Sequence, residues 1–156
     1  MRNLLLVRNR QRTRPVNTRL LRWMMRHLLQ ELLDIESYDL CVTLISDRAM
    51  TRLNEEHLRH AGTTDVITFD YNDPAAPGRI RGEIFVSVDE AITQAKRFRT
   101  SWPAEVVRYV VHGILHLVGH DDGTAEQRRA MKRDENRFLK ALDGEFRLEK
   151  LGKQGA

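Results

Sequence analysis

Cysteine is almost missing from this chain of 156 residues, which contains only Cys41. A single cysteine excludes an internal disulfide and any zinc ribbon built on cysteine ligands. Long apolar runs are missing as well. Arginines interrupt the N-terminal apolar run too early for a signal peptide, and no run approaches the roughly 18 apolar residues of a membrane span. We therefore expect a soluble protein of the cytoplasm.

Lysine is scarce too, because it supplies only five of the 26 basic residues and arginine supplies the others. A guanidinium group forms paired hydrogen bonds with phosphate, so this bias favours an anionic partner, although codon usage explains it equally well. The 22 acidic residues leave a net charge of +4. Apolar residues make up 41% of the chain, which excludes global disorder, and the length suits a single domain.

The apolar pattern predicts an α+β fold. Short apolar runs bounded by turn residues predict four strands, at 4–7, 40–45, 66–69 and 80–88. Helical spacing and N-cap residues predict about five helices, at 17–33, 46–57, 89–98, 101–118 and 124–142. Gly82 marks a bulge or a close backbone approach. We expect a small mixed four-stranded sheet packed with these helices in one domain over 1–142, followed by a C-terminal tail over 143–156.

The chemistry is concentrated in residues 111–122, whose sequence is VHGILHLVGHDD. His112 and His116 are four residues apart, so a helix places them on one face, where two imidazoles can chelate one metal ion. Zinc needs at least a third protein ligand, and His120, Asp121 and Asp122 follow. Eight residues of straight helix rise about 12 Å, so His120 cannot share a metal with His112 unless the helix breaks.

Gly119 supplies such a break, because glycine adopts the left-handed turn without penalty. The chain can then double back and present Asp122 to the two histidines. The pattern His-x3-His-x2-Gly-x2-Asp matches the third-ligand spacing of metzincin metallohydrolases and favours Asp122 over His120. Three ligands leave one position for water, whose pKa zinc lowers from about 15.7 to about 7, so a catalytic site is favoured over a structural one.

Gly113 occupies the position directly after the first histidine. Zinc peptidases of this geometry carry a glutamate there as general base, and glycine has no side chain to replace it. The remaining interpretation is attack by metal-activated water on an electrophilic anionic group such as a phosphodiester.

Neighbouring residues have two interpretations each. Asp65 and Glu83 are candidates to orient a ligand imidazole, or they are strand-end carboxylates that face solvent. Arg108 and Tyr109 lie one helical turn before His112. They are candidates to line the site, although a solvated helix face and a core edge are the more common roles for such residues.

Three segments resemble the YbeY family of bacterial endoribonucleases. Residues 112–122, HGILHLVGHDD, are similar to the family motif H-G-x-L-H-L-x-G-[Y/H]-D-H. Residues 53–54 and 64–69, LN and TDVITF, are similar to its L-N and T-D-V-L-S-F block, and residues 82–87, GEIFVS, to its G-[D/E]-I-x-I-S strand. The order of elements agrees from about Asn3 to Leu142.

The resemblance implies a compact α+β fold with a metzincin-like zinc site. It also implies a metal-dependent, single-strand-specific endoribonuclease that uses one Zn²⁺ and acts in 16S rRNA 3′-end maturation and ribosome quality control. The expected partners are ribosomal RNA and the small ribosomal subunit. The alternatives are a metzincin-like metallopeptidase, which lacks its base here, and a non-enzymatic ribosome assembly factor with a structural metal.

Carried over by position, the resemblance makes His112 and His116 the first two metal ligands. Asp122 stands where the family usually has its third histidine, which reduces the net charge of the metal centre. The arginine that the family commonly has four residues after its Leu-Asn asparagine falls at Leu58 here. Either Arg59 takes its place through a local shift, or the phosphate charge is met from elsewhere. The expected catalytic residues are therefore His112, His116 and Arg59.

Overall fold

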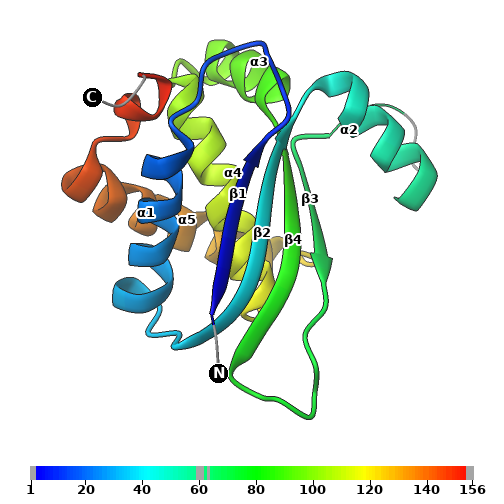
Figure 1. Cartoon of the computed structure of the whole chain (residues 1–156), viewed down its shortest axis with the longest axis vertical. Helices are drawn as coiled ribbons and strands as arrows, with labels where there is room; N and C mark the ends of the chain where they lie inside the picture. Colours follow the sequence, from blue (N-terminus) through cyan, green and yellow to red (C-terminus); the bar gives the residue numbers. More distant parts are fainter. Residues whose placement is uncertain (1–2, 59–61, 63, 154–156) are drawn as a thin grey trace.

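A four-stranded mixed sheet forms the centre of the fold (Figure 1). The computed structural model describes residues 3–58, 62 and 64–153. Its strands are β1 (Leu4–Asn9), β2 (Ser37–Ile45), β3 (Val66–Asp70) and β4 (Arg79–Ser87), and they lie in the order β1-β2-β4-β3. β1, β2 and β4 run parallel, whereas β3 pairs antiparallel with β4. This arrangement confirms the predicted α+β class and the predicted mixed sheet.

The helices begin at capping side chains that the sequence displays. They are α1 (Thr18–His27), extended by η1 (Leu28–Leu32), α2 (Asp47–Leu53), extended by η2 (Asn54–Leu58), α3 (Val88–Phe98), α4 (Trp102–Leu117), α5 (Ala125–Phe146) and the short η3 (Leu148–Gly152). A first-turn backbone N–H donates to the side chain of each N-cap residue, namely Asn17, Ser46, Ser87, Ser101 and Thr124. The α-helices match the five predicted segments.

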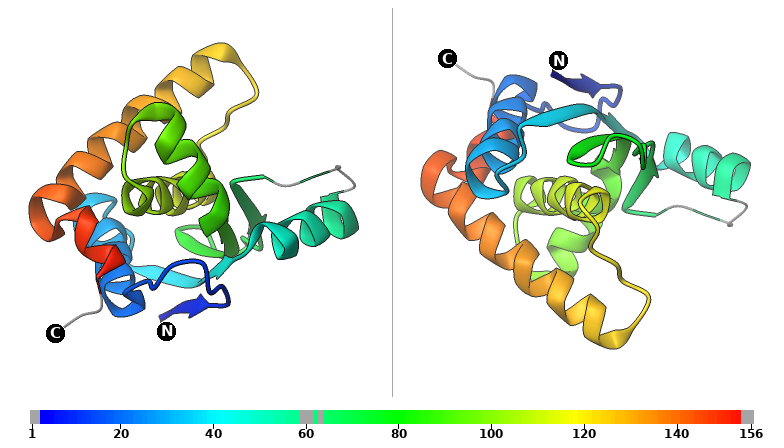
Figure 2. Two further views of the ribbon diagram at one scale, coloured as in Figure 1. Left: turned by 90° about the horizontal axis from the view of Figure 1, so that it is seen from above. Right: turned by 90° about the horizontal axis from the view of Figure 1, so that it is seen from below.

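Helix α4 lies between the sheet and the outer helices α3 and α5, as the end-on views show (Figure 2). Two glycines allow this close packing. A Cβ atom on Gly113 of α4 would lie 2.9 Å from both Thr68 Oγ1 and Ile84 Cδ1 on the sheet. A Cβ atom on Gly82 of β4 would lie 2.9 Å from Leu117 Cδ1 of the same helix. The close approach predicted at Gly82 is therefore confirmed, and α4 is held directly against the sheet.

The segment after Leu142 belongs to the packed structure. Helix α5 continues to Phe146, and the side chains of Leu148 and Leu151 on η3 are buried in the main core. Their burial explains why the chain expected to form a tail over 143–156 is packed up to Gly152, while residues 154–156 lie outside the described part. None of the helices in the described ranges has the length and hydropathy that crossing a membrane requires.

Candidate metal centre

The C-terminal half of α4 carries His112 and His116, and the chain reverses directly after it. Gly119 has φ 108°, a left-handed conformation that glycine adopts at low cost. The backbone N–H of His120 donates to Leu115 O at 3.0 Å, which fixes the turn against the last residues of the helix. The predicted helix break is therefore present at Gly119, and it returns the chain past the two histidines.

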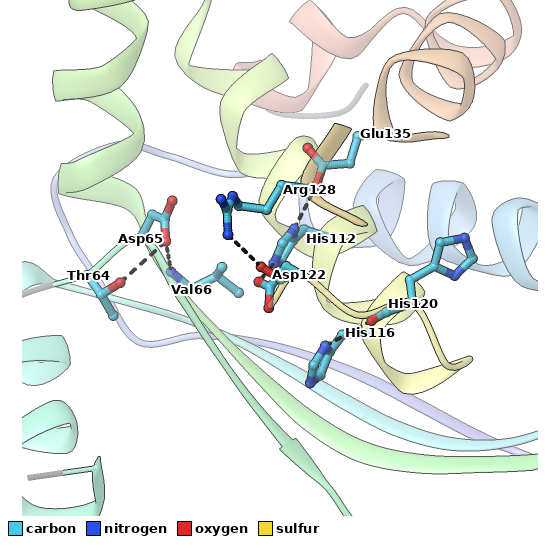
Figure 3. A network of polar contacts seen from close by, with 9 residues as sticks. All are labelled: Thr64, Asp65, Val66, His112, His116, His120, Asp122, Arg128 and Glu135. Atoms are coloured by element: carbon cyan, nitrogen blue, oxygen red, sulfur yellow. Dashed lines mark hydrogen bonds and ion pairs between the residues drawn. The ribbon is translucent and has the colours of Figure 1, made fainter. Parts of the chain in front are cut away.

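The imidazole of His112 is held by a carboxylate on α5. Its Nδ1–H donates to Glu135 Oε2 at 2.7 Å (Figure 3), and this bond is the main reason why the pKa of His112 is raised. Burial opposes the shift, whereas the negative charges of Glu135, Asp65 and Asp122 add to it. With Nδ1 occupied, Nε2 is the nitrogen that remains for a metal ion.

The imidazole of His116 is oriented by backbone. Its Nδ1 lies 3.1 Å from the carbonyl oxygen of His120. A carbonyl oxygen only accepts hydrogen bonds, so Nδ1 carries the proton and Nε2 has the free electron pair. The chain reversal at Gly119 therefore fixes the tautomer of His116 in the form that binds a metal.

Asp122 lies beside His112 after the reversal. Its Oδ2 is 3.9 Å from His112 Nε2, within the span of roughly 4 Å that two zinc bonds of about 2.0–2.2 Å can bridge. Half of its side chain is exposed, at 52%, and Arg128 Nη1 donates to its backbone carbonyl at 3.2 Å. The structure thus brings together two of the three expected ligands.

His120 has a different partner. Its Nε2–H donates to Asp134 Oδ2 at 2.9 Å, and its ring points away from His112 and His116 (Figure 3). Asp122, which the spacing favoured over His120 as third ligand, lies at the site, and the His120 ring does not. The contribution of His120 is its carbonyl oxygen, which holds His116.

The complete set of ligands is not gathered in this conformation. Over the described ranges, no group of three His, Cys, Asp or Glu side chains is close enough to hold a metal ion. The donor chemistry nevertheless fits one, because both imidazoles direct Nδ1 to a fixed acceptor, the arrangement that metal-bound histidines almost always have.

The carboxylate that orients His112 is one that the sequence analysis missed. Glu135 is only 8% exposed and also accepts from Arg108 Nη1 at 3.2 Å. A signal was available, since Glu135 lies in the apolar stripe of α5 with Met131, Phe138 and Leu142. A carboxylate in such a stripe is buried and needs a partner.

Asp65 and Glu83, the two carboxylates that the sequence offered as candidates for this role, lie elsewhere. Asp65 Oδ1 accepts from the backbone N–H of Val66 at 2.8 Å, and its charge acts on His112 without a hydrogen bond (Figure 3). Glu83 follows Gly82, which faces α4, so the strand pleat directs Glu83 to the opposite face of the sheet. Neither orients a ligand imidazole.

Cationic groups near the site come from α4 and α5. Arg108 pairs with Glu135, whereas the hydrogen bond that the structure gives the Arg128 guanidinium goes to the uncharged Asp122 carbonyl, which leaves its charge available. Arg59, expected as the catalytic arginine, lies outside the described residues. Arg128 is therefore the cation that the described structure holds beside Asp122.

A family model described as "Endoribonuclease YbeY" matches residues 6–143. The chain belongs to the YbeY family. This membership confirms the resemblance drawn from residues 112–122 and the two strand motifs.

Curated relatives named "Endoribonuclease YbeY" agree with this assignment. The protein from Chlorobium phaeobacteroides (strain BS1) is 44% identical over 97 residues, which cover 62% of this chain and 67% of that protein. The Parabacteroides distasonis protein is 38% identical over 109 residues, 70% of this chain and 75% of its own. The Salinibacter ruber protein is 35% identical over 127 residues, 76% and 81% of the two chains.

A solved structure supports the fold. The chain resembles the solution structure of TM1509 from Thermotoga maritima with a TM-score of 0.68 over 94% of this chain and 93% of that one. At 23% identity, this likeness concerns the architecture alone.

Proposed function

We propose that this member of the YbeY family is a metal-dependent, single-strand-specific endoribonuclease that acts in 16S rRNA 3′-end maturation and ribosome quality control. Family membership over residues 6–143 supports the endoribonuclease activity. The observation that carries the metal dependence is the pair of imidazoles whose Nδ1 atoms are both fixed, next to an aspartate. Ribosomal RNA and the small ribosomal subunit are the proposed partners, in the cytoplasm.

We propose His112, His116 and Asp122 as the residues that hold one divalent ion, with zinc as the expected metal. When bound, such an ion polarises a phosphoryl oxygen and lowers the pKa of a coordinated water. Glu135 keeps the His112 ring in place and supplies negative charge behind it, which raises the basicity of Nε2. The carbonyl oxygen of His120 keeps the His116 ring in place in the same way but adds no charge.

Arg128 is the residue that we propose for binding the RNA backbone at this site. Its guanidinium lies beside Asp122, and the hydrogen bond that the structure gives it goes to an uncharged carbonyl. A guanidinium in such a place can neutralise the charge that develops on a phosphate during cleavage. Arg59 remains the second proposed cation.

Packing at Gly113 weighs against the metallopeptidase alternative. A Cβ at this position would already be 2.9 Å from Thr68 and Ile84, so there is no room for the glutamate that those enzymes place after their first histidine. At the position after His112, this fold therefore lacks the glutamate that zinc peptidases use as general base.

The test is cleavage of a single-stranded RNA that contains the precursor 3′ end of 16S rRNA, with added Zn²⁺ or Mn²⁺ and with a chelator. We expect cleavage that requires metal and that His116→Ala abolishes. His27→Ala is the matched control, because His27 on α1 contacts the Phe146 ring and takes no part in the site. Equal cleavage by His116→Ala would assign the activity to a contaminant.

Binding to rRNA separates the enzyme from the assembly-factor alternative. If the protein binds the same RNA with and without metal but never cleaves it, the endoribonuclease proposal is wrong. A chelator would then lower only the thermal midpoint.

A further inference from the structure

A cavity of about 280 Å³ lies beside the candidate metal centre, among α3, α4, α5 and the residue before β3. Asp65, Arg108 and Tyr109 contribute to its wall. Arg108 also pairs with Glu135, the carboxylate that holds His112, and Asp65 acts on His112 by its charge. Arg108 therefore connects the wall of the cavity to the carboxylate that holds His112. The volume is just below the range of about 300–1,000 Å³ typical of drug-sized ligands, which suits a single nucleobase.

Tyr109 is the unusual residue in the wall of this cavity. Tyr109 is 5% exposed, and its Oη is the one buried side-chain polar atom of the described residues without a hydrogen-bond partner. Buried hydroxyls almost always have a partner, because an unpaired one loses its hydration without compensation. A residue that lines a cavity and whose hydroxyl lacks a partner in the protein is suited to a partner that arrives from outside.

Carboxylates dominate the surroundings of this hydroxyl. Glu105 is 6% exposed and also lines the cavity, and its Oε1 accepts from Thr100 Oγ1 at 2.7 Å. Burial is the main cause that raises the pKa of Tyr109, followed by the negative charges of Asp65, Glu105 and Glu90, with Arg108 opposing. The carboxylates of Asp65 and Glu105 favour a ligand that offers N–H donors.

Donors line the same cavity. Arg108 and Lys132 both line it, and the Tyr109 O–H can donate as well as accept. The ligand that matches has adjacent N–H donors for a carboxylate and an acceptor next to them. Among the four RNA bases only guanine has this edge, with N1–H, the N2 amino group and O6. Phe98, which is 60% exposed, adds an apolar wall at which a base can lie.

We propose that this cavity binds a guanine base of the single-stranded RNA, next to the phosphate at the metal centre. Splayed bases recognised along their Watson–Crick edge are the usual route to sequence preference in single-stranded RNA. The inference deepens the proposed endoribonuclease function and rests on it for the identity of the substrate. Asp65 and Glu105 accept from the base, and Tyr109, Arg108 or Lys132 donate to O6.

Binding of short oligouridylates to the full chain tests this proposal. The probes carry one central guanosine, one inosine, which lacks the N2 amino group, or uridine alone, and a chelator prevents cleavage. We expect the guanosine oligonucleotide to bind roughly tenfold more tightly than the inosine one in a fluorescence anisotropy titration. Equal affinity for all three would overturn the proposal.

Two variants locate the preference. Tyr109→Phe removes only an unpartnered hydroxyl, so we expect a folded protein in which the preference for guanosine shrinks severalfold. Glu105→Gln should reduce the guanosine-to-inosine ratio further. Tyr71→Phe is the matched control, since Tyr71 is half exposed and does not line this cavity. A guanosine preference that Tyr109→Phe and Glu105→Gln both leave intact would place the base elsewhere and contradict the proposal.

Cleavage assays with the same oligonucleotides keep the two proposals separate. Selective binding of guanosine without any cleavage would support the cavity and refute the endoribonuclease function. Metal-dependent cleavage with no preference for guanosine would support the endoribonuclease function and refute the guanine site in the cavity.

Discussion

Replacing Glu135 by glutamine tests the link between α5 and the metal centre. The carboxylate is 8% exposed and accepts from both His112 Nδ1, at 2.7 Å, and Arg108 Nη1, at 3.2 Å. Glutamine keeps the shape but removes the negative charge and one acceptor oxygen. Loss of such a carboxylate behind a metal-bound histidine usually lowers metal affinity 10–100-fold, or about 1.4–2.7 kcal/mol.

The same substitution acts on stability and on the titration of His112. Hydrogen bonds to charged groups contribute about 1.5–3 kcal/mol, so we expect Glu135→Gln to lower the free energy of unfolding by this amount in the metal-free protein. The bond to Glu135 is the main cause of the raised pKa of His112, and burial opposes it. The pKa of His112 should therefore fall in Glu135→Gln.

Three measurements on one pair of variants check this reasoning. Competition with a chromophoric chelator gives the zinc affinity, urea unfolding gives the stability, and the His112 ring proton in an NMR titration gives the pKa. Glu126→Gln is the control, because Glu126 lies exposed in the first turn of the same helix. If Glu135→Gln binds zinc as tightly as the unchanged protein while the His112 pKa falls, His112 is not a metal ligand.

Three further predictions concern the same site. Gly119→Ala should cost about 1–3 kcal/mol of stability, because a residue other than glycine is strained at φ 108°. The substitution should also weaken metal binding, because relief of this strain would displace Asp122. Gly144→Ala is the control in the same urea experiment and should be neutral or stabilising, because Gly144 lies in helix α5 with open space around it. Gly113→Ala should cost about 1–3 kcal/mol by pushing α4 off the sheet, measured by thermal unfolding. Because the pKa of His112 is raised in the folded state, protonated His112 should stabilise the metal-free protein fully below about pH 6.5, and this stabilisation should disappear as the pH rises through the raised pKa. Thermal midpoints measured across pH check this, and they should depend less on pH in Glu135→Gln.

Local signals were enough to predict most of the fold. N-cap side chains such as Ser101 and Thr124 fix where helices begin, and the alternation of apolar residues fixes the strands. The C-terminal ends of helices were harder to predict, because they depend on contacts with distant parts of the chain. Helix α5 passes the predicted end at Leu142 since Leu148 and Leu151 beyond it find a place in the core, which no local pattern shows.

In the candidate site, too, local features could be predicted from the sequence and contacts between distant residues could not. The spacing of His112 and His116 and the glycine at 119 are local features, so the chain reversal was predictable and the structure contains it. Glu135 is 23 residues from His112 and meets it only because α5 packs across α4. A buried acidic residue in an apolar stripe shows that a partner exists but does not name it.

The carboxylate in the third-ligand position makes charge the deciding quantity at this centre. Asp122 and Glu135 each place a negative charge against His112, and a histidine in place of Asp122 would remove one of them. We therefore expect Asp122→His to bind Zn²⁺ still, with a lower apparent pKa for the metal-dependent activity, because the ion would keep more of its own charge. Oxygen donors favour harder ions, so the unchanged protein should tolerate Mn²⁺ better than Asp122→His does. Rates measured with both metals across pH decide this, and an Asp122→His profile that coincides with the original one would show that Asp122 does not contact the ion.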